Sequence, residues 1–164
     1  MRRGSAARSV AGMTAIISIR RGAVSAHLGL AVLVVAGVFA QIYLIGGYIF
    51  GAGEEALDAH RTVGFTVHAF EVWILIAALV AWLPRPDLGL SLLMALGGTA
   101  QIALSGAERW TGALHPLGAL FVLVLGTVLI RRDLHHRRRV HEPAHGATAE
   151  GPMPIRRTGH IDQI

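Results

Sequence analysis

The chain has 164 residues, of which 53% are hydrophobic and 15% are charged, and its mean hydropathy is +0.54. These values exclude an ordinary water-soluble domain, because the apolar residues come in blocks long enough to cross a bilayer. The absence of cysteine excludes disulfides, thiolate metal sites, iron–sulfur clusters and covalently attached c-type haem.

The apolar residues form four segments that are separated by short polar turns. A basic segment at 1–22 comes before them, and an Arg/His-rich tail at 131–164 follows and is predicted to be disordered. The domain between them covers 23–130, with spans predicted at about 23–50, 61–83, 88–106 and 111–130.

Four spans joined by short loops predict an all-α protein, an integral membrane up-down four-helix bundle, because every backbone group in a bilayer must be paired within a helix. All 15 basic residues are arginine: five lie in 1–22, one in the 84–87 turn and seven in 131–164, against Arg61 and Arg109 in the other two loops. This distribution predicts a multi-pass protein of the bacterial plasma membrane with both termini cytoplasmic. It explains the +5 charge without nucleic acid as a partner.

A short repeat relates the first and third spans. Residues 39–47 and 99–107 agree at five of nine positions, and one matched pair is Gln41 with Gln101. A histidine opens the next helix in each case, His60 after the first loop and His115 after the second. The chain therefore reads as two similar helix hairpins, an arrangement that often places a site at the interface between repeats. The alternative is chance similarity between helices of simple composition.

The second span carries a polar stripe. His60, Gly64, His68 and Glu71 fall on one face of a helix. Polar groups at membrane depth are costly, so this face is expected to point into the bundle. The glycine leaves room there for close helix packing or for a flat cofactor.

His115 precedes Pro116, which favours the first turn of a helix, so His115 is expected at the mouth of the fourth span as His60 is on the second. In an up-down bundle these two helices are diagonal neighbours. Two histidines at matching heights can hold the iron of a haem b from both sides. Arg61 would then meet a propionate at the membrane edge.

The other members of the predicted site have supporting roles. His68 would be an alternative ligand or a neighbour of the ligands, and Gln41 and Gln101 would support the histidines. Glu71 is a candidate proton site, because a carboxylate at this depth must be protonated or paired. No catalytic residue is assigned, and an enzyme is the less favoured interpretation.

Simpler interpretations remain for each polar residue. His60 and His115 can be interfacial histidines, His68 can be a buried donor satisfied by Glu71 or a glutamine, and Glu71 can have a purely structural role. His27, far from these residues, is interpreted as interfacial. In the tail, a metal site and a solvated basic segment near anionic lipid are both open. The tail histidines concerned are His135, His136, His141 and His145.

The motifs Gln41–Gly46, His60-Arg61-x-x-Gly64, Gln101–Gly106 and Leu114-His115-Pro116 resemble one four-helix half of haem A synthase over about residues 27–130. That resemblance implies His60 and His115 as the haem ligands. Leu57 stands where the catalytic half of that enzyme has glutamate, and the second half is missing, so the synthase activity is not implied.

The layout is also similar to a family of small actinobacterial four-helix membrane proteins of unknown function. The shared elements are Asp58-x-His60-Arg61-x-x-Gly64-x-x-x-His68, Gln101-x-x-Leu104 and Leu114-His115-Pro116. This resemblance implies the fold and the membrane location, and it implies no activity.

The leading hypothesis is thus a membrane subunit with one b-type haem, for electron transfer or haem handling with a redox partner or quinone. One alternative is a cofactor-free membrane module whose polar stripe holds the helices together. Another is a proton-coupled transporter or quinone-binding protein that uses Glu71 and His68. A transporter of four spans would need to form a homo-oligomer.

Overall fold

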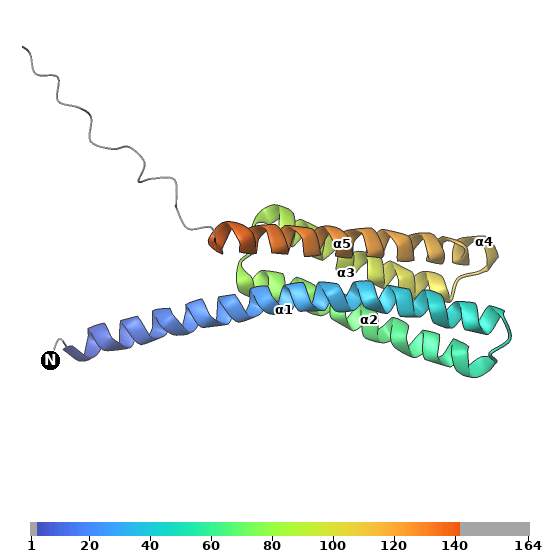
Figure 1. The fold of residues 1–164 in the computed structure, drawn as a ribbon, viewed down its shortest axis with the longest axis horizontal. Coiled ribbons are helices and arrows are strands. Elements are labelled where there is room, and N and C mark those ends of the chain that lie inside the picture. Colours follow the sequence, from blue (N-terminus) through green and yellow to red (C-terminus); the bar gives the residue numbers. More distant parts are fainter. Residues whose placement is uncertain (1–2, 142–164) are drawn as a thin grey trace, which may run out of the picture.

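The computed structural model describes residues 3–141, all of whose regular structure is helical. Four long helices and one short helix follow each other along the chain (Figure 1). Their bounds are α1 Arg3–Ile49, α2 Glu54–Ala81, α3 Arg85–Ser105, α4 Arg109–Gly112 and α5 Leu114–His141. The predicted all-α class with four long helices is confirmed.

The four long helices lie side by side and alternate in direction, because short turns connect them. α1 packs against α2 and α5, and α3 packs against the same two helices. Within the described part of the chain, α2 and α5 have no close backbone contact, so they are diagonal to each other as predicted. The N-terminal part of α1 extends beyond the other helices in Figure 1.

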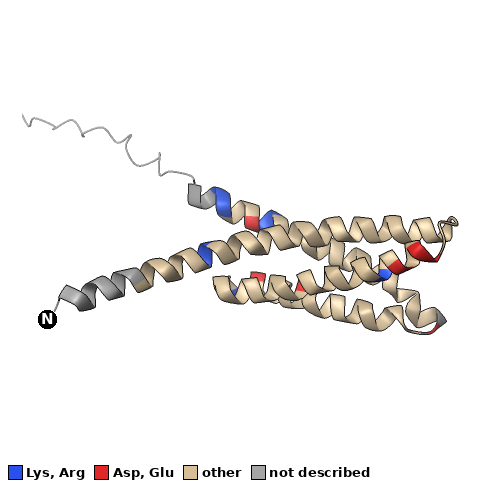
Figure 2. Ribbon diagram, turned by 90° about the horizontal axis from the view of Figure 1, so that it is seen from below, with Lys and Arg blue, Asp and Glu red and all other residues tan. Residues whose placement is uncertain are grey.

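Each long helix has a segment that is long and apolar enough to cross a membrane. These segments are Gly12–Ile49, Glu54–Ala81, Arg85–Ser105 and Trp110–Arg138, with mean hydropathies between 1.5 and 2.4. Large apolar side chains also point away from the bundle on every one of them, among them Phe39, Trp73, Leu96 and Val124. Most of the arginines and acidic residues that Figure 2 colours lie towards the two ends of the bundle.

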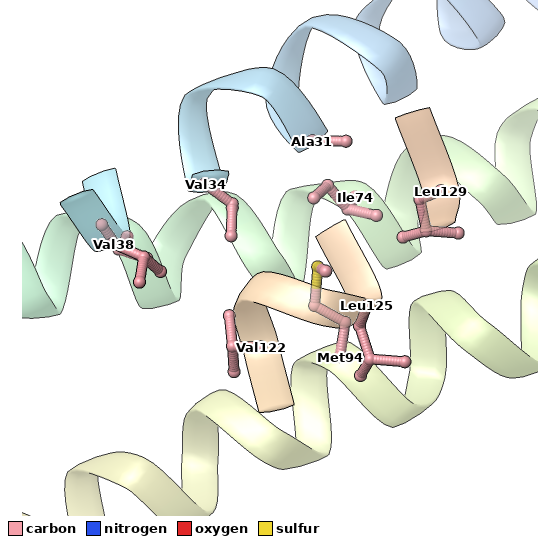
Figure 3. Packing of buried hydrophobic residues seen from close by; sticks show 9 residues of the cluster. Ala31, Val34, Val38, Ile74, Met94, Val122, Leu125 and Leu129 are labelled. Atoms are coloured by element: carbon pink, nitrogen blue, oxygen red, sulfur yellow. The ribbon is translucent and has the colours of Figure 1, made fainter. Parts of the chain in front are cut away.

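Buried aliphatic side chains fill the middle of the bundle (Figure 3). On α1 they recur every three or four residues at Ala31, Val34 and Val38, the spacing that keeps one helical face against the core. They meet residues of the other three helices, namely Val67, Ile74, Met94, Val122, Leu125 and Leu129.

Glycines allow the helices to approach closely at two points. A Cβ built at Gly37 of α1 would overlap Val67 of α2, and one at Gly126 of α5 would lie 2.8 Å from Cγ2 of Val35 of α1. Small residues at such crossings let backbones come together, which is the usual way helices associate without water.

The helix bounds differ from the sequence prediction at several ends; α3, for example, begins at Arg85, within the predicted 84–87 turn. α1 is continuous from Arg3, so most of the predicted basic segment 1–22 belongs to the same helix as the first span. α2 begins at Glu54 and not near 61, because acidic residues stabilise a helix N-terminus and the preceding turn uses Gly51 and Gly53 at φ of 95° and 83°. α5 continues through 131–141, which the sequence assigned to the tail, and 142–164 lie outside the described residues.

Candidate functional site

A pocket of about 580 Å³ opens at the end of the bundle where the α1–α2 turn and α4 lie, which we call the pocket end. All four long helices contribute to its lining, which is mostly apolar. The structure brings all seven residues of the predicted site into this one lining: Gln41, His60, Arg61, His68, Glu71, Gln101 and His115. Its volume lies in the range of ~300–1,000 Å³ that is usual for cofactor sites.

Gln41 of α1 and His60 of α2 hold each other by two hydrogen bonds. Nδ1 of His60 lies 3.1 Å from the backbone oxygen of Gln41, and Nε2 of Gln41 donates to the backbone oxygen of His60 at 2.8 Å. Both residues are half-buried. The pair therefore fixes the ring of His60 relative to α1.

The second hairpin repeats one of these bonds. Nδ1 of His115 at the start of α5 lies 3.1 Å from the backbone oxygen of Gln101 in α3. Each predicted glutamine is thus joined to the predicted histidine of its own hairpin, and the contact runs through the main chain of the glutamine.

These bonds determine the tautomers of both rings. A carbonyl oxygen can only accept a hydrogen bond, so Nδ1 of His60 and Nδ1 of His115 must each carry the proton. In the neutral ring, Nε2 then has a free lone pair. A backbone oxygen on the far nitrogen is the usual arrangement for a metal-binding histidine, because it fixes the ring and makes Nε2 more basic.

The two rings meet across the diagonal of the bundle. The centroids of His60 and His115 are 6.3 Å apart, with 70° between the ring planes. Two neutral imidazoles with protonated Nδ1 cannot bond to each other through Nε2, because both nitrogens are acceptors. The pair therefore presents two acceptors to whatever lies between or beside them.

Two glycines leave the space that the side chains of Gln41 and Gln101 occupy. A Cβ at Gly64 would lie 2.8 Å from Nε2 of Gln41, and a Cβ at Gly118 would lie 2.9 Å from Oε1 of Gln101. Gly64 follows His60 by one helical turn, so its missing side chain exposes the backbone oxygen that Gln41 reaches. The role predicted for Gly64, making room on this face, fits these contacts.

Two amide oxygens in the pocket lining are buried without a partner. Oε1 of Gln41 and Oε1 of Gln101 have no hydrogen bond in the described structure. An unpaired buried acceptor costs about 1–3 kcal/mol. Their equivalent positions in the two hairpins suit a molecule that offers hydrogen-bond donors.

Glu71 and His68 are within hydrogen-bond distance of each other deeper in the pocket. Nδ1 of His68 lies 3.1 Å from Oε2 of Glu71, and the Glu71 side chain is 3% exposed. Gly98 of α3 faces them, and a Cβ there would overlap Oε2 of Glu71 and lie 2.7 Å from Nδ1 of His68. The pairing of Glu71 with His68 is among the arrangements expected from their spacing.

Arg61 lies at the rim and not inside. Its Nη1 donates to Oδ1 of Asp58 at 2.9 Å, and the two side chains are 60% and 71% exposed. An exposed pair of this kind is weak, so Arg61 is free to exchange Asp58 for another anionic group at the pocket mouth.

A second polar cluster, at the opposite end of the bundle, was missed by the sequence analysis. His27 is fully buried, with Nδ1 2.7 Å from Oδ2 of Asp133 and Nε2 3.0 Å from Oγ of Ser91. Ser91 in turn donates to the backbone oxygen of Asp87 at 2.9 Å. The interpretation of His27 as interfacial is therefore wrong.

Asp87 extends this cluster to α5. Its Oδ1 accepts from Nε of Arg132, and its Oδ2 lies 3.3 Å from Nε2 of His136, within ion-pair distance but without hydrogen-bond geometry. The i, i+4 spacing of Asp87 and Ser91 on one helical face was the available signal. The basic and acidic partners on α5, Arg132 and Asp133, could not be recognised from the sequence because 131–141 was assigned to the tail.

The order Ser91–His27–Asp133 has the composition of a hydrolytic triad, but Ser91 is 0% exposed and no substrate can reach it. Among the described residues, no three or more histidine, cysteine or acidic side chains are grouped to hold a metal ion. His145, one of the tail histidines considered for metal, lies outside the described residues.

Comparison of the chain with protein-family models, with curated proteins and with solved structures finds no match. The resemblances seen in the motifs therefore stay predictions, and function has to be argued from the geometry of the pocket.

Proposed function

We propose that this chain is an integral protein of a bacterial plasma membrane that crosses the bilayer four times with both termini in the cytoplasm. Four helices of sufficient length and hydropathy support the crossing, as do the exposed apolar side chains on all of them. Arg85 at the α2–α3 turn and the arginines towards both termini support the orientation. The pocket then lies in the outer half of the membrane.

Within this bundle, we propose that the pocket holds one b-type haem between His60 and His115. The observation that carries the proposal is that each ring is fixed through Nδ1 to a backbone oxygen, while the ring centroids are 6.3 Å apart. If both rings bound one metal through Nε2, with about 2.0 Å from metal to nitrogen, their centroids would lie roughly 6 Å apart. The spacing fits a shared iron.

The remaining features of the pocket also fit this group. A porphyrin would supply four nitrogens to the iron, so the protein would need to supply two ligands at most. Two histidines would therefore be enough, and no group of three or more ligating side chains is needed; the described residues contain no such group. The lining is largely apolar, as a macrocycle requires, with Gly64 and Gly98 leaving space on two helices. Arg61 at the mouth can pair with a propionate in place of Asp58.

The role follows from the ligand set. A haem held by both His60 and His115 would supply one-electron chemistry and would leave no position for a substrate to bind. Gln41 and Gln101 would fix the two histidines, the apolar lining would exclude water, and Arg61 would balance the charge of a propionate. We therefore propose electron transfer or haem handling with a redox partner or quinone, and not catalysis by this chain alone.

An absorption spectrum of protein purified in detergent after expression with added haem precursor tests the proposal. The wild type should show a Soret band and sharp α and β bands on reduction. His60→Ala and His115→Ala should each lose the sharp bands, and external imidazole should restore them in part. His135→Ala, at an exposed position of α5, is the control and should keep the wild-type spectrum. A folded, colourless wild type contradicts the proposal.

A second candidate is a cofactor-free module in which the polar residues hold the helices together. The reciprocal bonds between Gln41 and His60 favour it, because they join α1 to α2 without any ligand. The unpaired oxygens of Gln41 and Gln101 do not decide between the two candidates, because a haem offers them no hydrogen-bond donor either. The same spectrum separates the two candidates.

A further inference from the structure

Among the residues that the structure describes, Glu71 is the one acidic side chain in the pocket lining. This side chain is 3% exposed, and Glu71 lies about three helical turns from His60 on α2. Its recorded partner is Nδ1 of His68 at 3.1 Å. A haem held by His60 and His115 has no need of this carboxyl group as a ligand, so its presence at this depth calls for another explanation.

The bundle keeps space for the Glu71–His68 pair. Position 98 on the facing helix is glycine, and any side chain there would collide with Oε2 of Glu71 and crowd Nδ1 of His68. The other buried positions of α3 all carry a side chain, namely Asp87, Ser91, Met94 and Ala95. The absence of a side chain at Gly98 of α3 therefore leaves the space that the Glu71–His68 pair of α2 occupies.

Few charges compete with this pair. The other titratable groups in the described part of the lining are His60 and Arg61 on α2 and His115 on α5, and the lining residues described on α1 and α3 include none. The charge of Arg61 is exposed at the rim and paired with Asp58. The remaining buried acids, Asp87 and Asp133, already have basic partners at the opposite end of the bundle.

A charge added to such a pocket must be balanced locally. An electron that enters from a one-electron reductant makes the pocket one unit more negative, and the low dielectric of its apolar lining screens this charge poorly. A proton taken from water by the Glu71–His68 pair restores the original charge. One electron and one proton then enter together, and both leave on oxidation.

We infer, resting on the proposed haem function, that Glu71 with His68 is a proton-exchange site coupled to the redox state of the cofactor in this pocket. Glu71 carries the exchanged proton, and His68 positions its carboxyl group. The site acts on the potential of the cofactor and not on its binding.

Spectroelectrochemical titration of haem-loaded protein at a series of pH values tests this inference. In the wild type, the midpoint potential should fall as pH rises, by up to about 59 mV per pH unit, which is the one-electron equivalent of a tenfold change in proton concentration. In Glu71→Gln, the α and β bands should persist while the slope becomes close to zero. Glu55→Gln is the matched control, an exposed carboxyl group on the same helix, and should keep the wild-type slope.

The infrared difference spectrum between reduced and oxidised protein gives a second readout. It should contain a carboxylic acid C=O band that is missing in Glu71→Gln and displaced in His68→Gln. A flat potential in the wild type, or a full slope in Glu71→Gln, overturns the inference while the haem proposal stands. A wild type without a Soret band overturns the haem proposal, and this inference falls with it.

Discussion

The rings of His60 and His115 lie with centroids 6.3 Å apart, although they come from α2 and α5, which are diagonal in the bundle. Each ring is fixed by its own hairpin through a glutamine backbone oxygen. The meeting of the two histidines is therefore a product of two similar hairpins packed face to face. Metal ligands that are oriented before the metal arrives bind it with less loss of freedom.

The fixing of His60 by Gln41 can be tested at Gly64. In Gly64→Ala the new Cβ would lie 2.8 Å from Nε2 of Gln41, so the bond from Gln41 to the His60 backbone oxygen should be lost. Loss of one such bond costs about 1 kcal/mol, so haem should dissociate ~5-fold faster from the variant. Transfer of haem to apomyoglobin measures this rate.

The control for that experiment is Gly46→Ala, because a Cβ at Gly46 meets no atom within 4 Å. Its haem dissociation rate should equal that of the wild type. Equal rates in all three proteins would show that the Gln41 bond does not support the ligand.

The space at Gly98 makes a prediction about stability. Gly98→Ala should lower the free energy of unfolding by about 1–3 kcal/mol, because the new Cβ collides with the Glu71 carboxyl group. Gly89→Ala should be nearly neutral, since a Cβ there meets nothing within 4 Å. Thermal unfolding in detergent, followed by circular dichroism, compares them.

Removal of the Glu71 side chain should relieve that collision. The double variant Gly98→Ala with Glu71→Ala is expected to lose less free energy of unfolding than the two single variants lose together. Additive losses would mean that the two residues do not share this space.

The buried cluster at the opposite end should govern stability and leave the pocket unchanged. His27→Leu leaves Asp133 buried without its partner, which typically costs about 3–5 kcal/mol. A double-mutant cycle with Asp133→Leu should show coupling between the two residues, while the haem spectrum of every variant stays that of the wild type. A change in the α and β bands would place the cluster in contact with the cofactor.

The topology can be tested by labelling, because the chain contains no cysteine. A single cysteine at Glu55 should react in intact cells with a maleimide that cannot cross membranes, whereas one at Arg85 should react only after lysis. The reverse pattern would place both termini and the α2–α3 turn outside the cell.

The sequence predicted the pocket residues better than the contacts that hold them. Gln41, Gln101, His60 and His115 were recognisable because polar residues are rare in apolar helices and recur at equivalent places. The bonds from Nδ1 to backbone oxygens were not predictable, since a main-chain acceptor has no sequence signature. The start of α2 was placed too late, because Glu54 and Glu55 read as loop residues although they stabilise a helix N-terminus.

The cluster around His27 escaped prediction for a different reason. Its members come from α1, α3 and the end of α5, and each one alone reads as a surface residue near a helix end. Only the packing of α5 beyond residue 130 brings Asp133 to His27 and Arg132 to Asp87. Partners of this kind are brought together by tertiary packing, which cannot be predicted from local composition.

The most direct test of the haem proposal is a titration of haem into the apoprotein in lipid nanodiscs, followed by absorption and by electron paramagnetic resonance of the ferric form. The account predicts saturation at one haem per chain, with a low-spin signal that becomes high-spin in His60→Ala and in His115→Ala. Binding that is absent in the wild type, or unchanged when both histidines are replaced, would contradict it.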